Sequence, residues 1–447
     1  MQEDSLALSV PASKRLASPM VIIGILFFVF GFVTWLGAVL IPYLQIACQL
    51  NIFESYLVTF AFYISYFIMA IPISPVLRRT GYKKGISLGL LFMAIGSLLF
   101  IPAAINRQYL LFLIGLFVQG MGLTLLQTAA NPYVTILGPR ESAAKRMSFM
   151  GMCNGVAAVL GPLVLGSVIL ENADKIGKQA KLLSPAERTL LLDELGRRVI
   201  LPYAIIAIVL ALLAVLAFFS GLPEINSDPE EDAMMEAEIA AVAAVPGGAT
   251  VPALVRSGKT KTSIFQFPHL LLGVLTLFLY VGVEVIAGDT VINYGVYYHI
   301  PLSSSRYFGN LTQIFMLIGY LVGAVCIPKY LSQEKALRYS SLLGIFFALA
   351  ALMTSGALSV VFVSLFGIAN AMIWPSIWPL AISGLGKFTK IASSLLIMAI
   401  GGGAILPLLY GYLAGKFDSH HAYWIVIPCY LAILFYSYKG HKIRTGR

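Results

Sequence analysis

The sequence predicts an all-α membrane protein with about twelve transmembrane helices in two six-helix bundles. Of its 447 residues, 59% are hydrophobic and 11% are charged, whereas a soluble domain carries about 25% charged residues. The apolar residues form continuous runs of about 20, the length that crosses roughly 30 Å of hydrocarbon. A transmembrane barrel would show short alternating segments instead. An ordinary soluble enzyme and a β-barrel are therefore both excluded.

We expect twelve spans, each justified by one apolar run. The fourth and tenth are rich in Gly and Pro and are less uniform than the others. The first run continues for more than twenty residues without a small-residue cleavage site, so we expect a retained helix and not a signal peptide. The spans cover residues 19–44, 55–77, 85–105, 109–135, 147–170, 199–220, 267–297, 306–327, 336–356, 358–384, 391–415 and 421–438.

Positive charge predicts the orientation of these spans. With twelve spans, most of the Lys and Arg clusters fall on one side, which the positive-inside rule makes cytoplasmic. Both termini are then cytoplasmic. Segment 171–198 falls on the other side and mixes both charges. Its Ser184-Pro185-Ala186-Glu187 start resembles a helix N-terminus, so we expect a helical outer loop.

The longest polar stretch divides the chain into two sets of six spans. It contains an acidic run, a Pro/Gly/Ala stretch and several basic residues, a composition typical of a linker. We therefore expect a cytoplasmic N-terminal segment, a first six-helix bundle, a cytoplasmic linker, a second bundle and a cytoplasmic tail. Their respective boundaries are 1–18, 19–220, 221–266, 267–438 and 439–447.

The two sets resemble one another at one point. Residues 131–138 close the fourth span and precede a span containing Gly161-Pro162, while residues 378–386 close the tenth and precede one containing Leu406-Pro407. A parallel repeat of six spans is typical of transporters whose site lies between two bundles. Chance similarity between Gly/Pro-rich helices is the alternative.

Two carboxylates lie inside apolar spans, Glu284 and Asp289, both in the seventh. An acid at the centre of a bilayer costs about 2.5–3.5 kcal/mol, so it must face a cavity or a partner. Five residues separate these two, and on a regular helix both face one cavity only if the helix loosens near Gly288. They are our candidates for ion coupling. A structural hydrogen bond for Glu284 and a solvated mouth position for Asp289 are the alternatives.

Amide side chains gather in the fourth and fifth spans. Gln127 and Asn131 are four residues apart and share one helical face, and the fifth span adds Asn154. Amides offer both donors and acceptors to a polyhydroxylated ligand. Hydrogen bonding between helices is the alternative.

The tenth span carries a second stripe, in which Asn370, Trp374 and Trp378 recur every four residues. Indole rings suit the apolar face of a sugar, and their N–H groups can reach a hydroxyl. Trp35 in the first span belongs to the same hypothesis. Aromatic packing in the core or at the membrane interface is the alternative.

Several function classes lack support. The sequence contains no Walker A, GxSxG, HExxH or paired-cysteine signature, so we expect no enzyme, no cofactor and no metal site. Four isolated cysteines are expected to pack. The net charge of +10 comes mostly from Lys and Arg clusters between the apolar runs, where they contact anionic lipid and determine the topology. We therefore expect no nucleic-acid partner.

Four sequence runs resemble the major facilitator superfamily, and within it the fucose/galactose/glucose:proton symporter family. The resemblance covers nearly all of the twelve spans and leaves out the linker and the outer loop. It rests on Leu36–Pro42, Leu126–Pro139, Tyr280–Val285 and Gly401-Gly402-Gly403 with Pro407.

This resemblance implies roles for individual residues. Gln127 falls where fucose carriers have a glutamate near the sugar and where glucose-type members have Gln. Asn131 and Asn154 fall on amides of the same region, and Trp374 falls on an aromatic position. Glu284 matches an acid of the glucose-type members.

One departure from the family pattern bears on coupling. Where the family has an aspartate thought to carry the proton, this chain has Ala38. Asp289 has no counterpart in the family. Glu284 is therefore our first candidate for the coupling group and Asp289 the second.

The resemblance implies a monomeric carrier that imports a monosaccharide across the bacterial inner membrane by alternating access. Glucose, galactose, fucose and an N-acetylhexosamine are the candidate sugars. We expect membrane lipid and a coupling cation as further partners, with H⁺ favoured and Na⁺ as the alternative. A uniporter, a drug:proton antiporter of the same fold and a membrane sugar sensor are the other hypotheses.

Overall fold

The computed structural model describes residues 19–136, 143–222, 264–327, 330–385 and 389–443, and these ranges contain helices and no strand. Eleven helical stretches are long and apolar enough to cross a bilayer. Helix α4 has 24 residues and contains the apolar stretch Leu57–Ala70, so it accounts for a further crossing. The expected all-α fold with about twelve membrane helices is confirmed.

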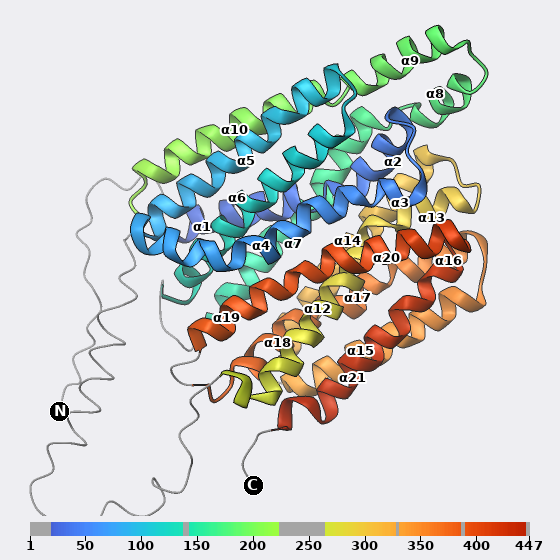
Figure 1. The fold of residues 1–447 in the computed structure, drawn as a ribbon. Helices are drawn as coiled ribbons and strands as arrows, with labels where there is room; N and C mark the ends of the chain where they lie inside the picture. The colour runs from blue at the N-terminus through green and yellow to red at the C-terminus, as the bar shows by residue number, and fades with distance from the viewer. Residues whose placement is uncertain (1–18, 137–142, 223–263, 328–329, 386–388, 444–447) are drawn as a thin grey trace, which may run out of the picture.

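The expected linker lies mostly outside the described residues. The helices before it in the sequence pack mainly with one another (Figure 1), and α5, α6 and α10 form their most extensive contacts. Their bounds are α1 Pro19–Thr34, α2 Gly37–Ala47, α3 Ile52–Ser55, α4 Leu57–Thr80, α5 Tyr82–Ile105, α6 Tyr109–Ile136, α7 Ala143–Ile169, α8 Ala173–Ala180, α9 Pro185–Arg197 and α10 Ile200–Phe219. We call this group the first half.

The helices from residue 264 onward form the second half, in which α12 packs against α18, α20 and α21. Their bounds are η2 Ile264–Gln266, α12 Pro268–Asp289, α13 Val291–Tyr297, α14 Leu302–Cys326, α15 Gln333–Met353, α16 Gly356–Ser364, α17 Phe366–Ala371, α18 Ile373–Ile382, α19 Thr389–Met398, η4 Ala399–Gly401, α20 Gly402–Lys416, η5 His421–Ile425, α21 Val426–Tyr438 and η6 Gly440–Lys442.

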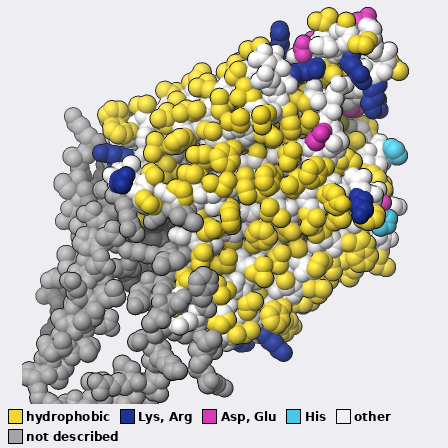
Figure 2. Space-filling model, viewed as in Figure 1, with side chains coloured by type: hydrophobic (Ala, Val, Ile, Leu, Met, Phe, Trp, Pro, Cys, Tyr) yellow, Lys and Arg dark blue, Asp and Glu magenta, His cyan; other side chains and the backbone are white. Residues whose placement is uncertain are grey.

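Hydrophobic side chains cover most of the surface between the two ends of the molecule (Figure 2), while Lys and Arg lie towards the ends. Many large apolar side chains on this surface are exposed, such as Val164 at 54% and Leu216 at 63%. In water this surface would be unstable. In a bilayer these side chains face lipid.

Small residues bring helices of the first half into close contact. A Cβ built on Gly122 of α6 would lie 2.4 Å from the carbonyl oxygen of Gly89 on α5, and a Cβ on Gly89 would lie 2.7 Å from the carbonyl oxygen of Gly122. Such mutual approach of backbones is typical of membrane helix packing. These positions therefore require glycine.

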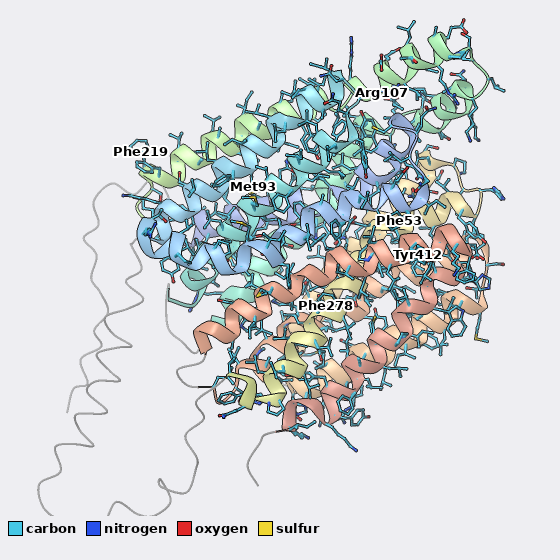
Figure 3. The ribbon with its side chains drawn as sticks, viewed as in Figure 1. Phe53, Met93, Arg107, Phe219, Phe278 and Tyr412 are labelled. Carbon is cyan, nitrogen blue, oxygen red and sulfur yellow. The ribbon has the colours of Figure 1, made fainter. Side chains whose placement is uncertain are left out.

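The expected helical loop at 171–198 is present as α8 and α9. The Ser184 backbone N–H and hydroxyl both donate to the Glu187 carboxylate, at 3.2 and 2.6 Å. Tyr43 of α2 donates to the carbonyl oxygens of Leu195 and Gly196, both at 2.8 Å. The two bonds from Tyr43 hold α9 over the end of the first half, near Arg107 in Figure 3.

Candidate functional site

The leading helix of each half is broken. α1 ends at Thr34 and α2 begins at Gly37, while α12 ends at Asp289 and α13 begins at Val291. The first expected span is therefore two helices in the structure. In the seventh span the break follows Asp289, just beyond the Gly288 position where we expected loosening. Broken helices of this kind commonly line transport sites.

The two breaks lie against each other across the halves. A Cβ built on Gly288 would lie 2.3 Å from Trp35 Cζ3, so the indole ring covers this glycine. A Cβ built on Gly37 would lie 3.0 Å from Asp289 Oδ2. Glycine at both positions lets a side chain of one half approach the backbone of the other.

Asp289 is buried at this contact, with 2% of its surface exposed. The Thr59 hydroxyl of α4 donates to Oδ2 at 2.8 Å, whereas Oδ1 is buried without a hydrogen-bond partner. No basic side chain in the described ranges pairs with it. Ionisable groups placed in this way inside membrane proteins usually have a function, and the mouth position suggested as an alternative for Asp289 does not fit its burial.

A cavity of about 10 Å³ lies beside Asp289, between α1, α2, α4 and α6. One water needs roughly 10–15 Å³, so the cavity suits a single water and is far too small for a sugar. Its polar lining comes from Thr34, Thr59, Tyr63, Gln119, Tyr203 and Asp289.

Glu284 has a different environment from Asp289, although both belong to α12. Its Oε1 accepts a hydrogen bond of 2.7 Å from Tyr280, one turn earlier on the same helix. Glu284 is half-buried. It therefore has a local partner within its own half, while Asp289 has its partner in the opposite half.

The amides of the first half occupy dissimilar surroundings. Gln127 is half-buried on α6. Asn131 lies on the same helix, but its side chain falls outside the described part of the structure. The Asn154 amide of α7 donates to the Phe27 carbonyl oxygen at 3.4 Å, which ties α7 to α1.

The expected stripe in the tenth span is interrupted, because α17 ends at Ala371 and α18 begins at Ile373. The Asn370 side chain is fully buried and its Oδ1 accepts a hydrogen bond of 2.9 Å from Tyr430, inside the second half. Trp374 and Trp378 are half-buried and stack on each other with ring centroids 5.5 Å apart.

Sequence reasoning did not select Gln313. Its side chain is buried on α14 and its Oε1 has no hydrogen-bond partner. A Cβ on Gly288 would lie 3.4 Å from Gln313 Nε2, so the amide borders the contact between Trp35 and Gly288. The sequence does contain a signal for Gln313, because it is an amide inside the apolar eighth span. The same criterion selected Gln127 and Asn154.

The halves also meet at the end of the molecule that carries α3 and α13. The Asn293 amide of α13 donates to Gln45 Oε1 of α2 at 3.2 Å. Helix α3 packs against α20, and Figure 3 shows their side chains Phe53 and Tyr412 at this contact. This end of the molecule is therefore closed around the buried Asp289.

Sequence comparison places the chain among known carriers. It is 34% identical over 421 residues to the glucose/galactose transporter of Brucella abortus, which covers 94% of this chain and 93% of the relative. It is 30% identical over 406 residues to the L-fucose-proton symporter of Escherichia coli, covering 90% and 88%.

Comparison with solved structures leads to the same group of carriers as the sequence comparison. The crystal structure of FucP, a Major Facilitator Superfamily transporter in the outward conformation, matches with a TM-score of 0.67 at 28% identity, over 94% of this chain and 97% of that one. Residues 23–406 match the sequence profile of the Major Facilitator Superfamily. This chain therefore belongs to the Major Facilitator Superfamily.

Proposed function

We propose that this protein is a secondary transporter that imports a monosaccharide across a bacterial inner membrane, coupled to a cation and with the proton favoured. The relatives at 34% and 30% identity, a glucose/galactose transporter and an L-fucose-proton symporter, support the substrate class. Alternating access between the two halves moves the sugar. Both termini face the cytoplasm, and the protein acts as a monomer.

Sugar binds between the halves in this proposal. Gln127, Asn131 and Asn154 supply amides from the first half, and Trp374 with Trp378 supplies aromatic surface from the second. Trp35 and Gln313 close over Gly288 from opposite halves, which supports a role in occlusion of the bound sugar. Asn370 contributes through its bond to Tyr430, so we assign it a supporting role.

Proton coupling is assigned first to Asp289 and second to Glu284, which reverses the order expected from the sequence. The observation that carries this assignment is the position of the Asp289 carboxylate, which belongs to one half but accepts a hydrogen bond from Thr59 and lies against Gly37 of the other. The Asp289 carboxylate lies beside the backbone that leads into Ala38. At that position the fucose/galactose/glucose:proton symporter family, which the sequence resembles, has its aspartate. A group that exchanges partners as the halves separate can couple its protonation to that movement.

The decisive experiment compares two acid-to-amide variants of one helix in proteoliposomes. Counterflow with a panel of labelled monosaccharides first identifies the sugar. Asp289→Asn should then abolish accumulation driven by a pH gradient but preserve sugar exchange, because exchange needs no net proton movement. Glu284→Gln is the matched control and should still accumulate sugar.

Other outcomes separate the alternatives. Loss of accumulation in Glu284→Gln alone would assign coupling to Glu284, and normal accumulation in both variants would remove both acids from the mechanism. A wild-type protein driven by Na⁺ alone, or by neither gradient, is a sodium symporter or a uniporter. Export of cationic drugs, or sugar binding without transport, would overturn sugar import itself.

A further inference from the structure

A second cavity lies between the halves, away from the buried Asp289. Its volume is about 160 Å³, far more than the roughly 10–15 Å³ that one water needs. Helix α7 of the first half and α14 of the second half form its walls. The lining residues are Pro162, Leu163, Val164, Ser167, Arg306, Tyr307 and Asn310.

The rim of this cavity faces hydrocarbon. Leu163, Val164 and Tyr307 are exposed by 40%, 54% and 49%, and they belong to the apolar surface between the two ends of the molecule. Arg306 is the fifth residue of α14, so it lies about 6 Å from the start of that helix. Ser167 lies two residues before the end of α7. The cavity therefore opens sideways near one end of the membrane helices, the depth at which lipid headgroups lie.

The inner wall is polar and incompletely paired. Arg306 donates to the Gly166 carbonyl oxygen at 3.1 Å and to the Tyr307 hydroxyl at 3.1 Å, and its guanidinium carbon lies 5.0 Å from the centre of the Tyr307 ring. Its Nε is buried without a partner, and no acid of the described ranges forms an ion pair with it.

Asn310, one turn further along α14, is 7% exposed and its Oδ1 is buried without a partner. A buried amide oxygen of this kind costs free energy until a donor reaches it. Arginine, for its part, is well suited to bind phosphate. The wall thus offers a cation for a phosphate and an acceptor for a hydroxyl or ammonium group.

We propose that this cavity binds the phosphodiester headgroup of a membrane phospholipid. The Arg306 guanidinium donates to a phosphate oxygen, and the Asn310 side chain turns so that its Oδ1 accepts from the hydroxyl or ammonium group of the headgroup. The acyl chains run over Leu163, Val164 and Tyr307 into the bilayer. Because the lipid touches both α7 and α14, its binding depends on the relative position of the two halves.

Native mass spectrometry of the full-length protein tests this site. The probes are phosphatidylglycerol and a diacylglycerol with the same acyl chains. The wild-type protein should bind a first equivalent of phosphatidylglycerol at least about tenfold more tightly than diacylglycerol. Arg306→Gln should lose this preference, whereas Arg306→Lys should keep most of it. Arg197→Gln, which removes a cation from α9 outside the cavity, should bind as wild type.

A second variant and three contrary outcomes keep the proposal falsifiable. If Arg306→Gln fails to fold, Val164→Trp fills the cavity from its exposed rim and should also lose the first equivalent. Equal binding of both lipids by the wild-type protein would overturn the proposal. So would equal losses in the variants at 306 and 197. Displacement of the lipid by millimolar inorganic phosphate alone would reassign the cavity to a soluble anion and overturn the lipid assignment.

Discussion

At the scale of single residues, Thr59 and Asp289 form a buried hydrogen bond between the halves. The bond measures 2.8 Å and both side chains are about 2% exposed. A buried carboxyl group that loses its donor is left unsatisfied, which costs more than the net contribution of an ordinary hydrogen bond. Thr59 is therefore expected to matter for stability as well as for position.

Thr59→Val should lower the apparent unfolding temperature in detergent, reflecting a loss of about 1–3 kcal/mol, because Asp289 then has no hydrogen-bond donor. Thr59→Ser keeps the hydroxyl and should retain most of the stability. Thr276→Val is the matched control, since the Thr276 hydroxyl bonds to Leu272 of its own helix. Equal decreases of the unfolding temperature in Thr59→Val and Thr276→Val would show that the bond between the halves stabilises the protein no more than a bond within one helix.

Sugar recognition gives a second prediction at this scale. Gln127→Ala should weaken sugar binding by about 2–13-fold, the effect of losing one hydrogen bond of 0.5–1.5 kcal/mol. Asn370→Ala should instead lower thermal stability, because it leaves the Tyr430 hydroxyl without its acceptor. Calorimetric titration with the identified sugar measures the first effect. Wild-type affinity in Gln127→Ala would exclude it from the site.

Individual residues also mark the limit of what the sequence could predict about the site. The criterion of an amide side chain in an apolar span selects both Gln127 and Asn370 as candidates for sugar binding. In the structure, however, Asn370 bonds to Tyr430 inside its own half. Periodicity places residues on one helical face but does not say what that face touches. The approach of Asp289 to Gly37 joins residues more than 200 positions apart, and no local pattern encodes that contact.

At the scale of helices, glycine pairs determine how closely neighbours pack. Gly122→Ala should destabilise the first half, because the new Cβ would lie 2.4 Å from the backbone oxygen of Gly89, which cannot move aside easily. Gly415→Ala on α20 is the matched control, since nothing lies within 4 Å of its Cβ position. That control should be neutral or slightly stabilising, by up to about 1 kcal/mol. Thermal unfolding of both variants in one detergent makes the comparison, and equal stability would show that α5 and α6 can separate without cost.

The helices themselves could largely be predicted from the sequence, because crossing a bilayer requires long apolar runs and these runs are conspicuous. The breaks in the first and tenth spans could not be predicted in this way. α1 and α2 separate at Trp35 and Leu36, and α17 separates from α18 at Met372, within runs that are largely apolar. Hydropathy measures transfer into lipid and carries no information about the local backbone turn.

At the scale of the whole molecule, the halves join at the end that carries α3 and α13, where Asn293 bonds to Gln45. FucP, with the same fold, has been solved in an outward conformation. Alternating access requires this contact to open and close in every cycle.

Locking that contact should therefore stop transport while leaving the protein folded. In a background without native cysteines, a short bismaleimide across Gln45→Cys and Asn293→Cys should abolish sugar counterflow, because neither half can move away from the other. The same reagent across Arg107→Cys and Asp193→Cys joins the turn after α5 to α9 within the first half, where the native side chains form an ion pair of 3.4 Å. Counterflow should survive in that control, because a bundle moving as one body keeps its internal distances. Continued counterflow after complete cross-linking of the first pair would mean that this end stays closed throughout the cycle, and the sugar would then need a route that does not pass between α2 and α13.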